Sequence, residues 1–256
     1  MSRCVIVSAG LISAYKKISS FFRNDDYFIF CDGGLNHLPK LSSCAAFPIT
    51  PSYIVGDFDS FDKNKINQIG KNLELENGGA TTEILVLPRE KDDTDTFAAV
   101  KLGLKMGFSD FLLLGVLGNR FDHSLCNISA LIYLHNHGVK ASIIDDFSEI
   151  EVLGTTKELM EKGIIPLENM PVQKKKYLAD KYGFLQNGEI PDSYSYFSLM
   201  NIAGDVSGVT IKNAKYPLEN DDIKAEFSLG VSNEVLPGKV AEVTVEKGLL
   251  LLVKVW

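Results

Sequence analysis

The first half of the chain contains a series of short, uniformly apolar runs, most of which are followed by glycine or aspartate. They occupy residues 4–8, 27–31, 52–55, 83–87, 110–114 and 141–145. A strand that is apolar at every position is buried on both faces, which is typical of a parallel sheet covered by helices. We therefore expect residues 1–148 to form an α/β domain with a doubly wound, mostly parallel, Rossmann-like sheet.

Apolar residues at helical spacing lie between these runs. Phe97, Val100 and Leu104 share one face of a predicted helix over 96–106. The next predicted helix ends at Gly138, a residue suited to the left-handed position that follows many helices. Strands that alternate with helices are the pattern of a doubly wound fold.

The chain changes character after residue 148. Residues 149–193 are charged and mostly unpatterned, and we interpret them as a connection that carries a surface insertion over about 155–192. Strand and turn patterns follow over residues 196–202, 208–212, 225–231, 240–246 and 249–256. Their spacing and alternation predict an antiparallel β-sandwich domain over residues 194–256.

Composition narrows the class of protein. With 45% hydrophobic and 23% charged residues, the 256-residue chain resembles an ordinary globular protein. A formal net charge of −7 argues against nucleic acid as a partner, because that backbone attracts cations. No segment reaches transmembrane length and no signal sequence is recognisable, so we expect no membrane partner. The four cysteines lack C-x-x-C spacing, which favours reduced thiols and the cytoplasm.

Acidic residues follow the carboxyl ends of several predicted strands. They are Asp32, Asp57, Asp59, Asp92, Asp95 and Asp122. Because parallel strands end at one edge of the sheet, we expect these carboxylates to converge on one crevice. Converging carboxylates repel one another unless a cation lies among them, and Mg²⁺ with phosphate oxygens is the natural candidate. Lys91 and Arg120 at the same edge suit the phosphates.

Each acidic segment also has a simpler interpretation. Lys91-Asp92-Asp93-Thr94-Asp95 is a good helix start, since Asp and Thr cap free backbone N–H groups and acidic residues favour the helix N-terminus. Asp32-Gly33-Gly34 and the segment around Asp57 could be turns. The same chemistry at four strand ends favours a shared site over four separate caps and turns.

The motifs Cys31–Gly34, Ile54–Ser60, Lys91–Asp95 and Leu117–His123 resemble, in order and spacing, those of the thiamine pyrophosphokinase family. Tyr196–Leu199, Lys215–Asn220 and Val231–Glu234 continue the resemblance into the second half. It implies an α/β catalytic domain and a β-sandwich domain in a homodimer, with active sites at the subunit interface. The implied reaction transfers the pyrophosphoryl group of ATP to the hydroxyl of thiamine, giving thiamine diphosphate and AMP.

The resemblance also implies roles for residues in the matching motifs. The magnesium ligands would be Asp57, Asp59, Asp92 and Asp95. The catalytic set would be Asp57, Asp59, Asp95 and Arg120, with Asp59 or Asp95 as general base. ATP would be bound by Asp32, Lys91, Arg120, Asp122 and His123, and thiamine by Asp59, Asp95, Ser232 and Asn233.

Two other functions fit the same crevice. The first is a different magnesium-dependent phosphotransferase, although the chain lacks the G-x-x-x-x-G-K-[ST] sequence of a P-loop enzyme. The second is a thiamine or nucleotide sensor without turnover. A sensor has no need for so many mutually repelling carboxylates, so the sequence favours the enzyme.

Overall fold

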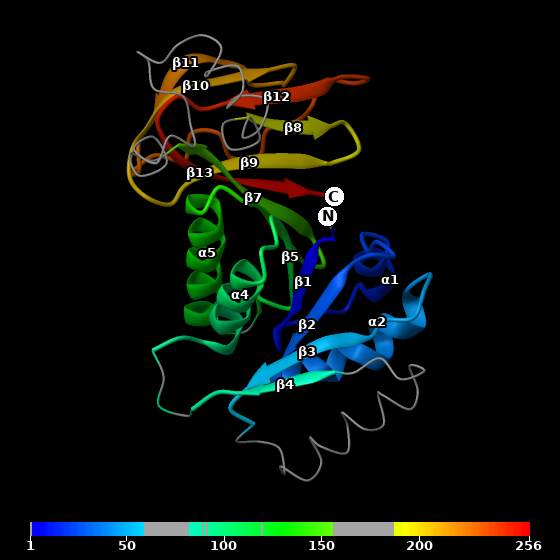
Figure 1. The fold of residues 1–256 in the computed structure, drawn as a ribbon. Coiled ribbons are helices and arrows are strands. Elements are labelled where there is room, and N and C mark those ends of the chain that lie inside the picture. The colour runs from blue at the N-terminus through cyan, green and yellow to red at the C-terminus, as the bar shows by residue number, and fades with distance from the viewer. Residues whose placement is uncertain (1, 59–81, 89, 91, 119, 156–186) are drawn as a thin grey trace, which may run out of the picture. The chain divides into compact units, whose positions relative to one another are not determined.

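The computed structural model describes residues 2–58, 82–88, 90, 92–118, 120–155 and 187–256, drawn in colour in Figure 1. The chain divides into two compact units. Unit 1 comprises residues 1–130 and 143–146, and unit 2 comprises residues 131–142 and 147–256.

Unit 1 is built on parallel strands. Its elements are β1 (Cys4–Val7), α1 (Tyr15–Ser19), β2 (Tyr27–Cys31), the 3-10 helix η1 (Asp32–His37), α2 (Leu38–Cys44), β3 (Pro51–Gly56), β4 (Glu83–Val86), α4 (Asp95–Lys105) and β5 (Asp110–Leu114). The strands follow the order β4-β3-β2-β1-β5, and each neighbouring pair is parallel. Helix α5 (Phe121–Asn136) and strand β6 (Lys140–Ile144) have residues in both units. The predicted parallel sheet is confirmed.

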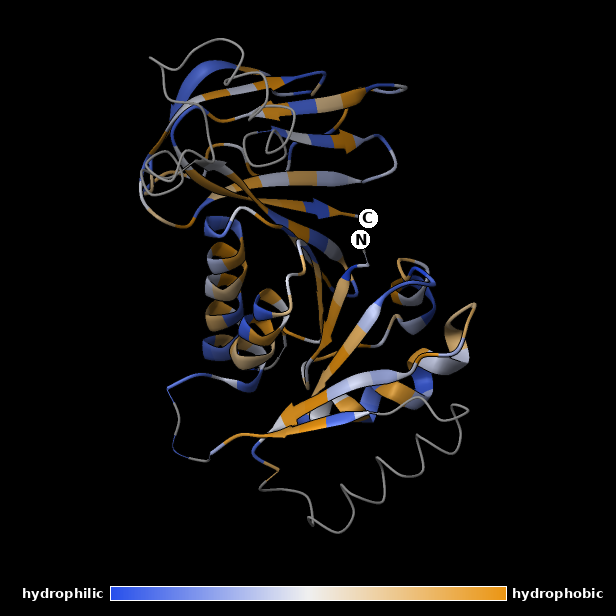
Figure 2. Cartoon of the chain, in the orientation of Figure 1, coloured by the Kyte–Doolittle hydropathy of each residue, from blue (hydrophilic) through white to orange (hydrophobic). Residues whose placement is uncertain are grey.

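The central strands of unit 1 are buried as their sequences predict. Every residue of β1 is inaccessible to solvent, and so are Phe111 to Leu114 of β5. Both strands are coloured as hydrophobic in Figure 2. Strands buried on both faces offer no polar side chains to a ligand. The residues that bind a ligand must therefore come from the loops that follow the carboxyl ends of these strands.

Strand β4 departs from the prediction of burial on both faces. Val86 is 58% exposed, and the other residues of β4 are exposed or half-buried. The reason is position, because β4 stands at the end of the strand order and pairs with β3 alone among the described strands. The apolar run over 83–87 therefore predicted a strand correctly and its burial wrongly.

Unit 2 is antiparallel. Its strands are β7 (Ser148–Thr155), β8 (Asn187–Pro191), β9 (Tyr196–Asn201), β10 (Val206–Lys212), β11 (Leu218–Ile223), β12 (Val240–Thr244) and β13 (Gly248–Val255). Strand β13 pairs with β7 and β9, and a second sheet has the order β11-β10-β12-β8. Their inward side chains form one core, which includes Phe197, Ile211 and Leu252. The predicted antiparallel sandwich is confirmed.

Two details of unit 2 differ from the expected elements. Residues 225–231 form turns instead of the predicted strand. The unpredicted strand β11 precedes them, and its sequence Leu-Glu-Asn-Asp-Asp-Ile is polar because most of it is exposed at the end of its sheet, where Figure 2 colours it as hydrophilic. Strands β7 and β8 include residues of the stretch 149–193, and most of the expected insertion lies outside the described residues.

Within the described ranges, no helix is long and apolar enough to cross a membrane.

Candidate active site

A cavity of about 580 Å³ opens at the carboxyl ends of the strands of unit 1. Its walls come from the segments that follow β1, β2 and β5 and from the start of α4. The lining residues are 8–12, 31–33, 37, 94–96, 115–118, 120, 123, 124 and 127. This is the edge at which open α/β sheets bind ligands, so the cavity is the candidate active site.

Four of the predicted site residues line this cavity. They are Asp32 after β2, Asp95 at the start of α4, and Arg120 and His123 after β5. Segments separated by about ninety residues of sequence are therefore brought together, as the convergence of strand ends requires.

The other predicted residues of unit 1 have different positions. Asp57 directly follows β3 and is half-buried, whereas Asp92 is exposed, and neither is among the described lining residues. A Cβ atom added at Gly56 would lie 2.9 Å from Cβ of Asp32, so the ends of β2 and β3 pack closely together. Asp59 and Lys91 lie outside the described residues.

The acidic segment before α4 caps the helix and contributes to the cavity at once. Thr94 is the N-cap, and its Oγ1 accepts a hydrogen bond of 3.2 Å from the backbone N–H of Phe97. Asp95 then occupies the first helical turn, where the helix dipole favours a carboxylate. Next to it, the buried hydroxyls of Thr96 and Ser8 are 2.7 Å apart, which ties the start of α4 to the end of β1.

Asp93 forms an ion pair with Lys101 instead of lining the cavity. Both of its carboxylate oxygens accept hydrogen bonds from Lys101 Nζ, at 2.7 and 2.9 Å, on the outer surface of α4. This pairing directs Asp93 to the surface of the helix, and Asp93 is not among the described residues that line the cavity.

Arg120 is oriented by Asp122. Its guanidinium donates two hydrogen bonds to the carboxylate, Nη2 to Oδ2 at 2.5 Å and Nε to Oδ1 at 3.2 Å. The hydrogen bond from Arg120 lowers the pKa of Asp122, which keeps that carboxylate charged. Asp122 thus holds a cation at the mouth of the cavity and neutralises part of its charge.

Close backbone packing explains Gly10, which lines the cavity, and Gly34, which lies in the turn beside it. A Cβ atom at Gly34 would lie 2.2 Å from the carbonyl oxygen of Val7, and one at Gly10 would lie 2.4 Å from that of Gly115. Only glycine permits these approaches, which press the turn after β2 and the segment after β5 against the end of β1.

Sequence reasoning missed several lining residues. Segment 8–12 and His37 carry no acidic motif, and the only available signal was Gly10 shortly after a buried strand. Asn127 is also a lining residue, and its Nδ2 donates a 2.6 Å hydrogen bond to the carbonyl oxygen of Val116. Such supporting contacts join separate elements and leave no local pattern.

The predicted thiamine residues of unit 2 are adjacent but have different environments. Ser232 is exposed, has a φ of 57°, and its N–H donates to Ser198 Oγ at 3.0 Å. Asn233 is only 1% exposed. Its Oδ1 accepts from the backbone N–H groups of Tyr216 and Glu234, and its Nδ2 donates to the carbonyl oxygen of Tyr216. Asn233 therefore fixes the loop that presents Ser232.

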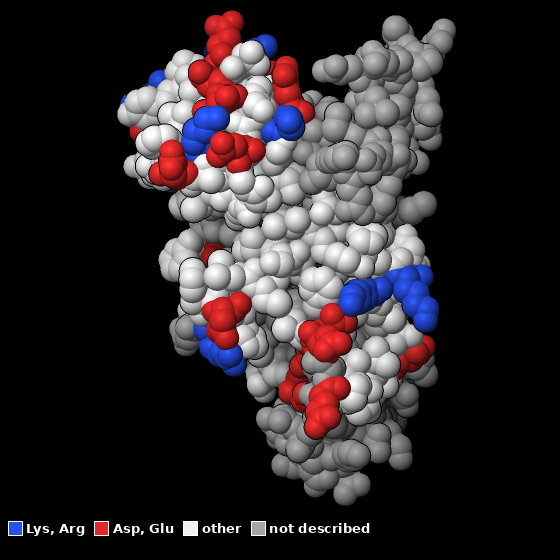
Figure 3. Space-filling model, turned by 90° about the vertical axis from the view of Figure 1, so that its left-hand side faces the viewer, with Lys and Arg blue, Asp and Glu red and all other residues white. Residues whose placement is uncertain are grey.

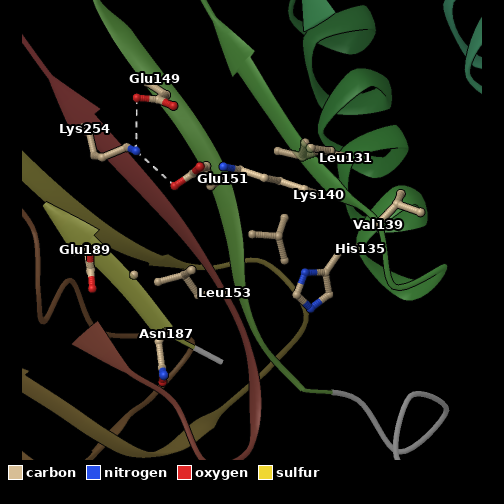
Figure 4. A pocket seen from close by; sticks show the side chains of 13 residues that line it. Leu131, His135, Val139, Lys140, Glu149, Glu151, Leu153, Asn187, Glu189 and Lys254 are labelled. Carbon is tan, nitrogen blue, oxygen red and sulfur yellow. Dashed lines mark hydrogen bonds and ion pairs between the residues drawn. The ribbon is translucent and has the colours of Figure 1, made fainter. Parts of the chain in front are cut away.

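A second cavity, of about 480 Å³, lies within unit 2 (Figure 4). Lys254 Nζ lies 3.0 Å from carboxylate oxygens of both Glu149 and Glu151, as the dashed lines show. His135 points into the same region and its Nε2 donates to the carbonyl oxygen of Gly154 at 3.1 Å. These buried or half-buried polar groups have partners within the protein, so a structural role accounts for them.

The donor set of the first cavity fits magnesium only together with phosphate. The described residues contain no group of three His, Cys, Asp or Glu side chains placed to hold a metal ion. Asp32 and Asp95 nevertheless place two carboxylates on one cavity. Mg²⁺ in phosphoryl-transfer sites is typically held by one or two carboxylates, with phosphates and water completing the octahedron.

On the face of the molecule drawn in Figure 3, the described basic side chains lie in small groups near acidic side chains.

Comparison with known proteins places both halves of the chain in one family. The model "Thiamin pyrophosphokinase, catalytic domain" matches residues 18–143, and "Thiamin pyrophosphokinase, vitamin B1 binding domain" matches residues 187–250. A curated Bacillus subtilis thiamine pyrophosphokinase is 25% identical over 206 residues, which are 80% of this chain and 79% of the relative.

Solved structures share the fold. The crystal structure of thiamine pyrophosphokinase from Bacillus subtilis superposes with a TM-score of 0.72 at 22% identity, over 99% of both chains. The yeast thiamin pyrophosphokinase structure gives 0.66 at 13% identity, over 100% of this chain and 86% of the other.

Proposed function

The chain belongs to the thiamine pyrophosphokinase family, and we propose that the cavity of unit 1 is its catalytic crevice. The activity is that of the family, the transfer of the pyrophosphoryl group of ATP to thiamine, which gives thiamine diphosphate and AMP. The observation that carries the assignment of the site is the convergence of Asp32, Asp95, Arg120 and His123 on one cavity at the carboxyl ends of the strands.

The reaction needs positioning and charge neutralisation more than covalent chemistry. The hydroxyl oxygen of thiamine attacks the β-phosphorus of ATP, the bond from that phosphorus to the oxygen of AMP breaks, and the hydroxyl proton passes to a carboxylate. We propose Asp95 or Asp59 as that general base. Asp95 is favoured by geometry, since it lines the cavity from the rigid first turn of α4.

Magnesium is part of the proposal. When bound, it would neutralise phosphate charge during the transfer. Asp95 would hold it together with Asp57, Asp59 and Asp92, directly or through water, since all four follow apolar strand segments in the sequence. Asp32 would contact the nucleotide or a water molecule of the metal.

The cationic groups at the mouth of the cavity would hold the phosphates. Arg120 is positioned by Asp122, and His123 lines the cavity from the first turn of α5. Lys91 is assigned the same role from its place in the motif. A phosphate entering the site would compete with Asp122 for the fork of Arg120, and a bidentate guanidinium suits that exchange.

Thiamine would be held by Asp59 and Asp95, and the segment around Ser232 would serve the cleft of the partner subunit in the proposed dimer. A carboxylate suits the positive charge of the thiazolium ring. Ser232 is exposed and can offer its hydroxyl, whereas the buried Asn233 would act by keeping that loop in place.

We propose further that the protein is a homodimer. In support, unit 2 exposes a cluster of large apolar side chains on β9 and on the adjoining loop, namely Tyr196, Met200, Leu229 and Val231. Hydrogen bonds from β9 to Gly230 and Asn233 hold the strand and loop side by side. Exposed apolar clusters of this kind commonly mark protein interfaces.

We also keep the cytoplasm as the proposed location. Cys4 and Cys31 are buried cysteines outside any disulfide, and burial raises the pKa of Cys4, which keeps that thiol protonated and unreactive.

Product analysis tests the function. The purified protein, incubated with magnesium, ATP and thiamine, should form thiamine diphosphate and AMP in equal amounts. Formation of ADP would instead indicate a phosphotransferase that moves one phosphate. Binding of both ligands without any product would indicate a sensor.

A further inference from the structure

His37 connects two walls of the cavity in unit 1. It ends the 3-10 helix η1, which begins at Asp32, and it is half-buried. Its Nε2 lies 2.9 Å from the carbonyl oxygen of Gly10, and its Nδ1 lies 2.8 Å from the hydroxyl oxygen of Tyr15 on α1. The imidazole thus joins the turn after β2 to the segment after β1.

The two hydrogen bonds fix the tautomer of His37. A carbonyl oxygen only accepts, so Nε2 must carry the proton that is donated to Gly10. In the neutral ring Nδ1 is then the acceptor for the hydroxyl of Tyr15. Burial lowers the pKa of His37, which favours this neutral form.

The segment that His37 contacts is held from other directions as well. The N–H of Gly10 donates to the carbonyl oxygen of Gly115 at 2.6 Å, and the N–H of Leu11 donates to that of Leu117 at 3.0 Å. At its far end, the carboxylate of Asp146 accepts hydrogen bonds from the N–H groups of Ser13 and Ala14. On the side that faces η1, the segment is held by the hydrogen bond from His37 to Gly10.

We propose that His37 is a positioning residue for the nucleotide. Through Gly10 it holds the η1 turn, with Asp32 at its start, at a fixed distance from segment 8–12, and so it sets the width of the crevice between them. The identity of the ligand rests on the proposed function, whereas the coupling of the two walls rests on the contacts alone.

Replacement of His37 should lower the affinity for ATP and leave the affinity for thiamine nearly unchanged. The loss of one positioning hydrogen bond corresponds to about a fivefold to tenfold change in affinity. We expect His37→Ala to raise the dissociation constant and KM for ATP by about that factor, with kcat changed less than about threefold and KM for thiamine less than about twofold. His37→Gln keeps an N–H donor that can reach Gly10 and should restore most of the affinity.

A matched control is His137→Ala. His137 is exposed at the C-terminal end of α5, bonds to the carbonyl oxygen of Tyr133, and is not among the lining residues. Its replacement should leave the affinity for ATP unchanged.

A second variant, Tyr15→Phe, removes only the hydrogen-bond partner of His37 Nδ1. It should lower the affinity for ATP by about twofold to threefold. If His37→Ala shows no cooperative thermal transition and so does not fold, Tyr15→Phe becomes the decisive variant.

Titration calorimetry with magnesium and ATP measures the affinity without turnover. A His37→Ala protein that binds ATP as tightly as His137→Ala would overturn the proposal, and so would a Gln variant as weak as the Ala variant. An equal loss of affinity for thiamine would also overturn it. A wild-type protein that makes no AMP would contradict the proposed function instead, while the order of ATP affinities would still decide the role of His37.

Discussion

Asp95 combines two properties that are usually separate in one residue. As the first residue of α4 it lies where the helix N-terminus favours a carboxylate, and its side chain lines the cavity. Thr94 caps the backbone of this helix, because its Oγ1 accepts a hydrogen bond from the N–H of Phe97. A carboxylate held in this way loses little freedom when a metal or substrate arrives.

We predict that Asp95→Asn lowers kcat by roughly a hundredfold or more, because it removes charge that the metal or the hydroxyl proton needs in the transition state. Asp57→Ala should have an effect of similar size. The matched control is Asp93→Asn, two residues away and paired with Lys101 on the surface. Initial rates of AMP formation, with melting curves for each variant, provide the measurement, and near-normal turnover of Asp95→Asn would remove that residue from the catalytic set.

At the scale of residues, sequence reasoning singled out four residues that line the cavity and missed the residues that support them. Asp32 directly follows one apolar run, and Asp95 and Arg120 lie in the segments that follow two others, so the convergence of strand ends predicted that they meet. His37 lies six residues after the end of β2, and its proposed role depends on a contact with Gly10 that no spacing rule encodes.

At the scale of elements, the contact between α5 and β7 in unit 2 predicts a dependence of stability on pH. His135 is 4% exposed, and burial lowers its pKa from the ordinary 6.5 to about 4. Below pH 6.5 the unfolded chain therefore binds this proton more readily than the folded chain. The stability that neutral His135 contributes is fully present above pH 6.5 and is lost as the pH falls through 4.

The expected loss is about 3 kcal/mol of unfolding free energy, of which most appears between pH 6.5 and 4. It is measured by urea unfolding of the wild type and of His135→Gln, which cannot take up the proton. The difference between the two proteins should shrink as the pH falls. A constant difference over this range would mean that His135 is not buried in the neutral state.

The sequence predicted the buried strands more reliably than the exposed ones. Strands β1 and β5 were found because both faces are covered and every residue except Asp110, at the start of β5, is apolar. Strand β11 was missed because its exposed, acidic sequence matches no strand pattern. The apolar run of β4 suggested a central strand, although its place at the end of the sheet depends on pairing that the sequence does not specify.

At the scale of the whole molecule, the exposed cluster on β9 and its loop predicts self-association. Met200 is 48% exposed within the cluster, and Met106 is 41% exposed at the end of α4 in unit 1. Light scattering coupled to gel filtration should give a dimer for the wild type and for Met106→Lys. Met200→Lys places a charge in the apolar cluster and should shift the protein towards the monomer. A monomeric wild type at micromolar concentration would refute the dimer.

The transfer of both terminal phosphates of ATP in one step is tested most directly with ATP radiolabelled at the β-phosphorus. With magnesium and thiamine, the label should appear in thiamine diphosphate and the AMP should be unlabelled. The Asp95→Asn variant should form labelled thiamine diphosphate more slowly than the wild type, by the same factor as its kcat is lowered. Label that remains in ADP, with thiamine monophosphate as the other product, would contradict pyrophosphoryl transfer at this crevice.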